Sequence, residues 1–346
     1  MFDRITGWTA LGTLLGCLSL VGCNGGGSSA SVSPATAEKV AKDGSQKPLT
    51  IAVIPKSTGG EFWQTVEIGA KLAAKDLGVN IKWEGALVET EIADENKIIE
   101  NMVNLGVDGI AMAPINPKAM RKPVENAVAA GIPVVVFDSA LDGDVQTSFV
   151  ATDNTAGGAL GAKYLLEKLP ANSKRVIVLR YIQGTSSTES RAQGFLDAAQ
   201  AGGVEVLRDA YTEDGQVSGA KKTSANVLEG FVKDSKLELD GIFCCNLNAT
   251  QGMLAALDDL HKSGVTTHLE FVGFDSSPKL IEQLQHGDID ALVVQNPKKM
   301  GYLAVETLVK HLRGEKVEPR IDTGVELVTA ERVEKEPEIR KLVGLE

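Results

Sequence analysis

Short apolar runs rich in β-branched residues recur along the chain from Thr50, and they constrain the fold more than any other feature. The runs read TIAVI, GIAMAP, PVVVFD, RVIVLR, GIFCCN, FVGFD and DALVVQ. Continuous apolar runs of this kind are typical of strands buried on both faces of a parallel sheet. Amphipathic, helix-length segments separate the runs, and this alternation predicts a doubly wound α/β fold.

The segments between the runs repeat apolar residues at helical spacing. One apolar face is predicted to comprise Phe62, Val66, Ala70, Ala73 and Leu77. A second face comprises Ile98, Ile99, Met102 and Val103, and its helix is expected to stop at Gly106. Further helices are predicted over residues 154–169, 189–201, 249–263 and 298–313.

The pattern of strands and helices occurs about twice. The first set spans Leu49 to Val150, and the second runs from Asp153 to near Gln295, after which one more helix follows. A chain of 346 residues is too long for one ordinary core, so we expect two lobes. Ligands bind such sheets at the carboxyl ends of the strands, which predicts a cleft between the lobes.

The N-terminus predicts a lipoprotein signal peptide over residues 1–22. Arg4 precedes an apolar stretch too short to span a membrane comfortably, and Leu20, Val21, Gly22 and Cys23 resemble a lipobox with Cys23 as the lipidated residue. An ordinary signal peptide with an incidental cysteine is the alternative. Residues 23–48 predict a flexible tether. We therefore expect a periplasmic protein, or one on the outer face of the cytoplasmic membrane, held by a lipid anchor.

The charge balance of the chain narrows its possible partners. The chain has 46 acidic and 35 basic residues, a net charge of -11, and no basic stripe, so nucleic acid is not an expected partner.

The mature chain is predicted to keep few cysteines. Cys17 is removed with the signal peptide, so only Cys244 and Cys245 remain beside Cys23. Adjacent strand residues face opposite ways, so a bridge between them would be strained. Buried free thiols are predicted.

Sequence signatures of catalysis are weak. There is no GxxxxGK loop, GTSSTES from Gly184 is not a nucleophile elbow, and Gly59 and Gly60 lack the GxGxxG spacing. The four histidines show no metal-ligand spacing. We expect no metal and no cofactor, and catalysis is the weaker hypothesis.

Polar residues stand at the ends of several apolar runs, namely Asp138, Asn246, Asp275 and Gln295. Carboxylates that accept, with amides that both donate and accept, suit a ligand rich in hydroxyl groups. The alternative is that each residue merely caps the following helix.

Aromatic and cationic residues fit the same kind of ligand. Phe62, Trp63 and Phe274 lie beside strand ends and could stack on the apolar face of a sugar ring, with core packing as the competing role. Trp63 is predicted to lie off the apolar face of its helix, which favours contact with the ligand over core packing for this residue. Arg191 could pair with Asp138 or reach ligand oxygens, or it could be a solvated arginine on a helix face.

These motifs in this order resemble the ribose-binding type of periplasmic sugar-binding proteins, the substrate-binding components of ABC importers. The similarity runs from Leu49 to about Thr329 and includes FVGFD, SRAQGF, GIPVVVFDSAL and ALVVQNP. It implies that Asp138, Arg191, Asn246, Asp275 and Gln295 bind ligand hydroxyls and that Phe62 and Trp63 form one wall. It also implies three hinge crossings, with an N-terminal lobe of residues 49–152 plus 296–324 and a C-terminal lobe of residues 153–295 plus 325–346.

The chain departs from the ribose-binding pattern at two places. Ser139 stands where that type has an arginine after the aspartate, and Lys56 stands where it has a small hydroxyl residue. We hypothesise that the cation has moved from one strand end to another. The aromatic residue expected from the second lobe is not evident, and Asp214 of YTEDGQ is a candidate in its place. The identity of the sugar is therefore left open.

The sequence thus predicts a non-enzymatic, monomeric solute-binding lipoprotein that takes a monosaccharide or similar polyol to an ABC transporter permease. A ligand-sensing subunit for a chemotaxis or two-component receptor is an alternative, and a sugar-acting enzyme that uses Asp138 or Asp275 as general base is a second. A repressor of related fold is not expected, because the predicted lipobox and tether take the place of a DNA-binding segment.

Overall fold

The computed structural model describes residues 47–170 and 175–346. The predicted signal peptide, Cys23 and all but the last two residues of the predicted tether lie outside the described residues. In the described part of the chain, no helix is both long and apolar enough to cross a membrane.

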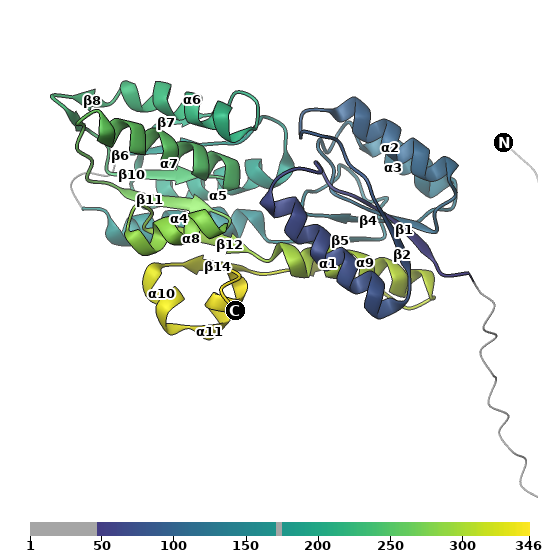
Figure 1. The fold of residues 1–346 in the computed structure, drawn as a ribbon. Helices are drawn as coiled ribbons and strands as arrows, with labels where there is room; N and C mark the ends of the chain where they lie inside the picture. Colours follow the sequence, from purple (N-terminus) through teal and green to yellow (C-terminus); the bar gives the residue numbers. More distant parts are fainter. Residues whose placement is uncertain (1–46, 171–174) are drawn as a thin grey trace, which may run out of the picture. The chain divides into compact units, whose positions relative to one another are not determined.

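The first sheet contains six strands in the order β13, β5, β4, β3, β1, β2, and all its neighbouring strands run parallel. Its strands are β1 (Thr50–Ile54), β2 (Asn80–Trp83), β3 (Gly109–Met112), β4 (Val134–Phe137), β5 (Ser148–Ala151) and β13 (Arg320–Asp322). Helices α1 (Glu61–Leu77) and α9 (Pro297–Leu312) cover one face, and α2 (Ile92–Asn104) and α3 (Arg121–Ala129) cover the other (Figure 1). We call this sheet and its helices the N-terminal lobe.

The second sheet also has six strands, in the order β14, β12, β11, β10, β6, β7. They are β6 (Arg175–Leu179), β7 (Glu205–Ala210), β10 (Gly241–Cys244), β11 (Glu270–Phe274), β12 (Ala291–Gln295) and β14 (Val325–Val328), which runs antiparallel to β12. Helices α4 (Asn154–Lys168) and α5 (Ser186–Ala201) cover one face. The other carries α6 (Val217–Glu229), α7 (Leu247–Lys262), α8 (Pro278–His286), α10 (Ala330–Lys335) and α11 (Pro337–Leu342). This is the C-terminal lobe, to which the short hairpin of β8 (Val232–Lys233) and β9 (Lys236–Leu237) belongs.

Each face of each sheet buries its own apolar core, because side chains alternate along a strand. In β1, for example, Ile51 and Val53 pack under α1 and α9, while Ala52 and Ile54 pack under α2 and α3. All four residues have no exposed surface. The predicted doubly wound α/β architecture with two lobes is confirmed.

One detail of the helix prediction is wrong. Trp63 lies on the buried face of α1, with 4% of its surface exposed, and packs in the same core as Val66 and Ala70. Residues three and seven positions apart share one side of a helix, so Trp63, Val66 and Ala70 form one stripe. Phe62 lies at the edge of this stripe and is only partly buried.

The chain passes between the two sheets at three places: after β5, after β12, and between β13 and β14. Hydrogen bonds join these three segments to one another. The hydroxyl of Thr152, after β5, lies 3.0 Å from the hydroxyl of Thr323, between β13 and β14, and it donates to Oε1 of Gln295, at the end of β12, at 3.3 Å. All three side chains are buried. The lobe boundaries given above, at residues 152, 295 and 324, stay a prediction.

Glycine permits a close helix contact in the C-terminal lobe. A Cβ atom on Gly158 of α4 would lie 1.9 Å from the carbonyl oxygen of Arg191 in α5. Only a residue without a side chain lets the two backbones approach this closely. The position of Arg191 therefore depends on this contact.

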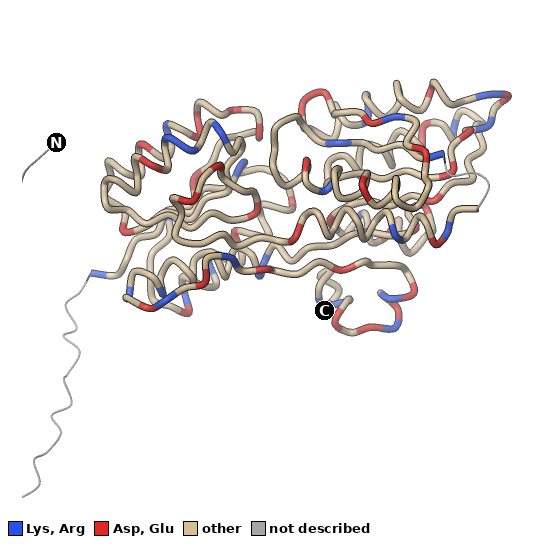
Figure 2. The backbone as a smooth tube through the Cα atoms, turned by 180° about the vertical axis from the view of Figure 1, so that it is seen from behind, with Lys and Arg blue, Asp and Glu red and all other residues tan. Residues whose placement is uncertain are grey.

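The two cysteines of the described chain are buried with free thiols, as predicted. Cys244 and Cys245 belong to the cores on opposite faces of the second sheet. Figure 2 shows Lys and Arg interspersed with Asp and Glu over both lobes, consistent with the absence of a basic stripe from the sequence.

Candidate functional site

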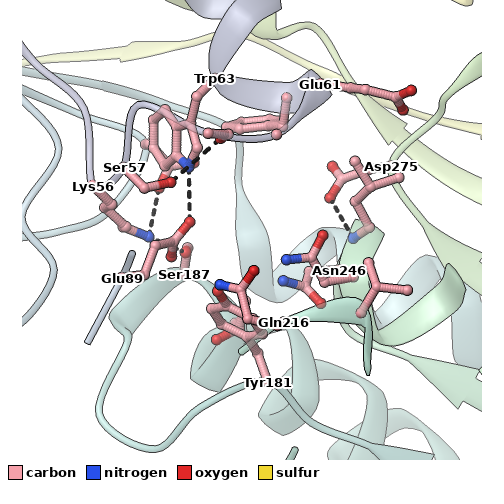
Figure 3. A pocket seen from close by; sticks show the side chains of 18 of the residues that line it. Lys56, Ser57, Glu61, Trp63, Glu89, Tyr181, Ser187, Gln216, Asn246 and Asp275 are labelled. Carbon is pink, nitrogen blue, oxygen red and sulfur yellow. Dashed lines mark hydrogen bonds and ion pairs between the residues drawn. The ribbon is translucent and has the colours of Figure 1, made fainter. Parts of the chain in front are cut away.

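A cavity of about 350 Å³ is lined by residues of both lobes (Figure 3). Strand ends, helix starts and loops all contribute to its wall. Eight residues predicted from the sequence line it: Lys56, Phe62, Trp63, Asp138, Arg191, Asn246, Asp275 and Gln295.

A buried ion pair stands at the N-terminal side of the cavity. Lys56 follows β1 and Asp138 follows β4, and Lys56 Nζ lies 2.8 Å from Asp138 Oδ2. Asp138 has φ 61°, an uncommon conformation that a short polar residue tolerates better than most. Ser139 donates to the same Oδ2 atom at 2.9 Å. In the described chain, no hydrogen-bond partner is seen for Asp138 Oδ1.

Glu89 is the second carboxylate on this side. Trp63 Nε1 donates to Glu89 Oε1 at 2.7 Å, as the dashed line in Figure 3 shows. The ring of Trp63 thus packs in the core, while its indole N–H binds a residue that lines the cavity. Burial raises the pKa of Glu89, while the positive charge of Lys56 and the hydrogen bond from Trp63 act in the opposite direction.

The C-terminal lobe contributes Asp275 and Arg191, which form a network. Asp275 Oδ1 accepts from Gln295 Nε2 at 2.7 Å, and Oδ2 accepts from the backbone N–H of Leu247 at 3.0 Å. Arg191 Nη1 lies 3.8 Å from Asp275 Oδ2. Burial raises the pKa of Asp275, and Arg191 is the main opposing influence. Both carboxylate oxygens of Asp275 are therefore already engaged within their own lobe.

Arg191 is fixed from several sides, which rules out the solvated helix-face role. Its Nε donates to Asn154 Oδ1 at 2.8 Å and its Nη1 donates to the carbonyl of Cys245 at 3.1 Å. The guanidinium lies 3.9 Å from the ring centroid of Phe274. Nη2 makes no hydrogen bond to another described residue, so it remains as a donor toward the cavity.

Ser187, at the start of α5, joins the two lobes. Its Oγ accepts from Lys56 Nζ at 3.2 Å and lies 2.8 Å from Ser139 Oγ, and both partners belong to the N-terminal lobe. The neighbouring Ser186 donates to the carbonyl of Ala140 at 3.3 Å. The lobes thus contact each other directly beside the cavity.

A buried carboxyl group lies on α2, outside the cavity lining. Both oxygens of Glu95 accept from the backbone N–H of Ile115, at 3.0 and 3.2 Å. Glu95 has no exposed surface, and burial raises its pKa to about 8. Its proton therefore stays bound at pH values where an exposed glutamate is ionised.

Three predicted residues do not reach the cavity wall. Ser139 lies behind Asp138 and is fully buried. Phe274 has no exposed surface and supports Arg191 from behind, because successive strand residues face opposite ways and Asp275 takes the cavity side. Asp214 is exposed and accepts from the backbone N–H of Gln216 at 2.9 Å, ahead of α6.

The capping alternative holds for one of the four strand-end residues. Asn246 caps α7 through its Oδ1, which accepts from the backbone N–H of Ala249 at 3.0 Å. Its Nδ2 group remains as a donor on the cavity side. Asp275 and Gln295 do not cap, because Ser277 and Asn296 take that role at α8 and α9.

Several lining residues were not predicted from the sequence. They come from loops and helix starts: Glu89, Tyr181, Ser187, Thr188, Gln216, Asn248 and Gln251. Ser187 and Thr188 stand in GTSSTES, whose strand-to-helix position was the available signal. Among residues 47–170 and 175–346, no group of three or more His, Cys, Asp and Glu side chains is placed to hold a metal ion.

Comparison with known proteins gives consistent matches over the described fold. The model of the periplasmic binding protein domain matches residues 51–316. The chain is 32% identical to the ribose import binding protein of Haemophilus influenzae over 285 residues, covering 81% of this chain and 91% of that protein. It is 28% identical to the D-allose-binding periplasmic protein of Escherichia coli over 276 residues, covering 78% and 86%.

Solved structures agree with these matches. A carbohydrate transporter solute-binding protein of Agrobacterium radiobacter, in complex with D-arabinose, superposes with a TM-score of 0.79 at 34% identity, covering 86% of this chain and all of that chain. An ABC transporter solute-binding protein of Agrobacterium vitis with bound D-fucose gives a TM-score of 0.79 at 35% identity, covering 85% and 99%.

Proposed function

This chain belongs to the periplasmic binding protein family, and from that membership we propose that it binds one monosaccharide or similar polyol and delivers it to an ABC-type sugar permease. The site residues of the sequence analysis that line the cavity are proposed to bind this ligand. The proposed protein is extracytoplasmic, monomeric and non-enzymatic.

The observation that carries the proposal is the pairing of charged and amide groups with aromatic rings in one cavity between the lobes. Lys56, Asp138 and Arg191 offer charge-assisted hydrogen bonds, each contributing about 1.5 to 3 kcal/mol. Phe62 and Trp63 supply rings beside them, which suit the C–H face of a sugar.

Closure of the lobes would enclose the ligand. The three segments that pass between the sheets are the places where backbone angles can change during opening. Direct contacts such as Lys56 to Ser187 form only when the lobes meet. A permease could then distinguish loaded from empty protein by the relative position of the lobes.

A melting-temperature screen tests the proposal. The chain from Lys47 would be heated with D-ribose, D-allose, D-arabinose or D-fucose, the sugars named for its relatives and structural neighbours. A ligand at about 100 times its dissociation constant adds roughly 2.7 kcal/mol to the free energy of unfolding. If none of these sugars, nor any other polyhydroxylated compound, shifts the transition, the sugar-binding function is refuted. Sugar recovered unchanged from denatured protein supports binding without turnover, whereas a converted sugar contradicts it.

We further propose that Cys23 carries the lipid anchor. Replacing Cys23 by Ser in the full chain should move the protein from the membrane fraction to the soluble fraction, because the acylated thiol is lost. The same membrane association in both forms would contradict the anchor. The sugar-dependent melting shift should be the same in both forms, so this test is separate from that of binding.

A further inference from the structure

The polar groups left free in the cavity differ between the two lobes. On the N-terminal side, Glu89 Oε2 and Asp138 Oδ1 are carboxylate oxygens for which the described residues supply no hydrogen-bond donor. On the C-terminal side, the free groups include charged and amide N–H donors, because Arg191 Nη2 and Asn246 Nδ2 make no hydrogen bond to described residues. The amide oxygens of Gln216 and Gln251 also have no donor among the described residues, but the described residues of this side offer no free carboxylate oxygen comparable to those of Glu89 and Asp138. The carboxylate of Asp275, in contrast, is already engaged through both oxygens.

Glu89 also differs from the other two carboxylates in its charge environment. Asp138 lies 2.8 Å from Lys56, and Asp275 lies 3.8 Å from Arg191. Within the described chain, Glu89 has no cation within ion-pair distance, and its one side-chain partner is the neutral indole N–H of Trp63. Desolvation raises its pKa, and the more distant charge of Lys56 and the hydrogen bond from Trp63 act against this rise. A donor brought by the ligand would compensate the charge of Glu89.

We propose that a bound monosaccharide directs hydroxyl donors toward Glu89 and Asp138, and acceptor oxygens toward Arg191 and Asn246. Glu89 is the residue that selects among sugars, because it requires a hydroxyl group at one ring position. This inference rests on the proposed sugar-binding function. Trp63 is a positioning residue, since its N–H holds Glu89 Oε1 and leaves Oε2 for the ligand.

Fluorine substitution separates the two kinds of contact. Fluorine in place of a hydroxyl group keeps a weak acceptor and removes the donor. The probes are the single deoxyfluoro derivatives of whichever sugar, among D-ribose, D-allose, D-arabinose and D-fucose, shifts the melting transition most. Substitution at positions that face Glu89 or Asp138 should weaken binding about tenfold or more, because a carboxylate enclosed in the occupied cavity loses its donor. Substitution at positions that face Arg191 or Asn246 should weaken it much less.

The Glu89→Gln variant then assigns one position to Glu89. Its amide presents N–H groups where the carboxylate presented Oε2, so fluorine at that position should be tolerated about fivefold better than in the wild type. The Trp63→Phe variant should reduce the discrimination at the same position only. Glu61→Gln is the matched control, because Glu61 lines the same cavity but is exposed, and Figure 3 shows its carboxylate pointing away from Glu89. It should leave the fluorine profile unchanged.

The outcomes are distinguishable by calorimetric titration. If the wild type binds the parent sugar but tolerates fluorine equally at every position, the proposed orientation of the sugar's donors and acceptors is wrong. This measurement uses only the wild type, so it does not depend on the folding of any variant. An unchanged profile in folded Glu89→Gln contradicts the role of Glu89. Tighter binding of an amino-deoxy sugar than of its parent would show that Glu89 takes an ammonium group, which overturns the hydroxyl assignment. Binding of no sugar by the wild type refutes the proposed function itself.

Discussion

Lys56 and Asp138 form a buried ion pair of 2.8 Å although 82 positions separate them in the sequence (138 − 56 = 82). The two residues follow β1 and β4, whose carboxyl ends lie at one edge of the first sheet. Lys56 also donates to Ser187 of the other lobe. One ammonium group therefore links the proposed ligand site to the contact between the lobes.

Replacement of Lys56 by Met should weaken sugar binding about tenfold or more. Removing one partner of a buried ion pair typically costs about 3 to 5 kcal/mol, since the other charge is left uncompensated. The measurement is calorimetric titration with the sugar that shifts the melting transition most. Lys71→Met is the control, because the Lys71 pair with Glu67 is exposed and contributes little. Equal affinity in the wild type and Lys56→Met would show that Lys56 does not set the ligand preference.

Replacement of Asp138 by Asn should abolish most of the sugar-dependent melting shift while the protein stays folded. Asparagine tolerates φ 61° about as well as aspartate, so the backbone is preserved while the charge is lost. Ala is the less informative change, because it adds backbone strain. Circular dichroism checks the fold, and a thermal scan with and without sugar checks binding. A full shift in Asp138→Asn would count against the role of this carboxylate.

Replacement of Glu95 by Gln should change how stability depends on pH. The pKa of Glu95 is about 8 in the folded protein and about 4.5 when unperturbed, so the folded state holds one more proton between these values. The contribution of Glu95 is fully present below pH 4.5 and is lost as pH rises through 8. The wild type should therefore lose stability relative to Glu95→Gln between pH 5 and 9, by on the order of a few kcal/mol.

Denaturant unfolding at several pH values measures this difference. Glu100→Gln is the matched control, since Glu100 is exposed on the same helix, and it should show no such trend. Parallel curves for the wild type and Glu95→Gln would contradict a raised pKa at this site.

Replacement of Gly158 by Ala should lower the melting temperature and weaken sugar binding together. The added Cβ would meet the carbonyl oxygen of Arg191 at 1.9 Å, so α4 and α5 must separate. Such overpacking costs about 1 to 3 kcal/mol and moves the backbone that carries the Arg191 guanidinium. Gly230→Ala is the control, because its nearest neighbour would lie at 3.5 Å and its φ is -65°. A stable Gly158→Ala variant with full affinity would contradict the close contact.

Most of the central strands could be predicted from the sequence because they are buried on both faces. All seven apolar runs are strands, from β1 to β12. The edge strands β2, β7, β13 and β14 were not predicted, because they have mixed burial and lack continuous apolar runs. The interior strand β5 was also missed, since SFVA is short and begins with a polar residue, as was the two-residue hairpin of β8 and β9. The pairing of the edge strands depends on neighbours far away in the sequence, which a local pattern does not reveal.

Some residues of the candidate site could likewise be predicted from a local sequence pattern, and others could not. Asp138, Asp275 and Gln295 could be predicted because parallel strands bring their carboxyl ends together. Glu89 and Ser187 could not, since they reach the cavity from a loop and from a helix start that only the tertiary fold positions. Phe274 was predicted to line the cavity because it directly precedes Asp275, but side-chain alternation along the strand places it on the opposite face of the sheet.

The three passages of the chain between the sheets also bear on how the protein is made. Strands β13 and β14 are the terminal strands of different sheets, and both come from residues 320–328. A nascent chain that has left the ribosome as far as Leu312 therefore lacks one edge strand in each lobe. Although synthesis usually lets the first domain fold before the next is made, here both halves are completed by the same late segment.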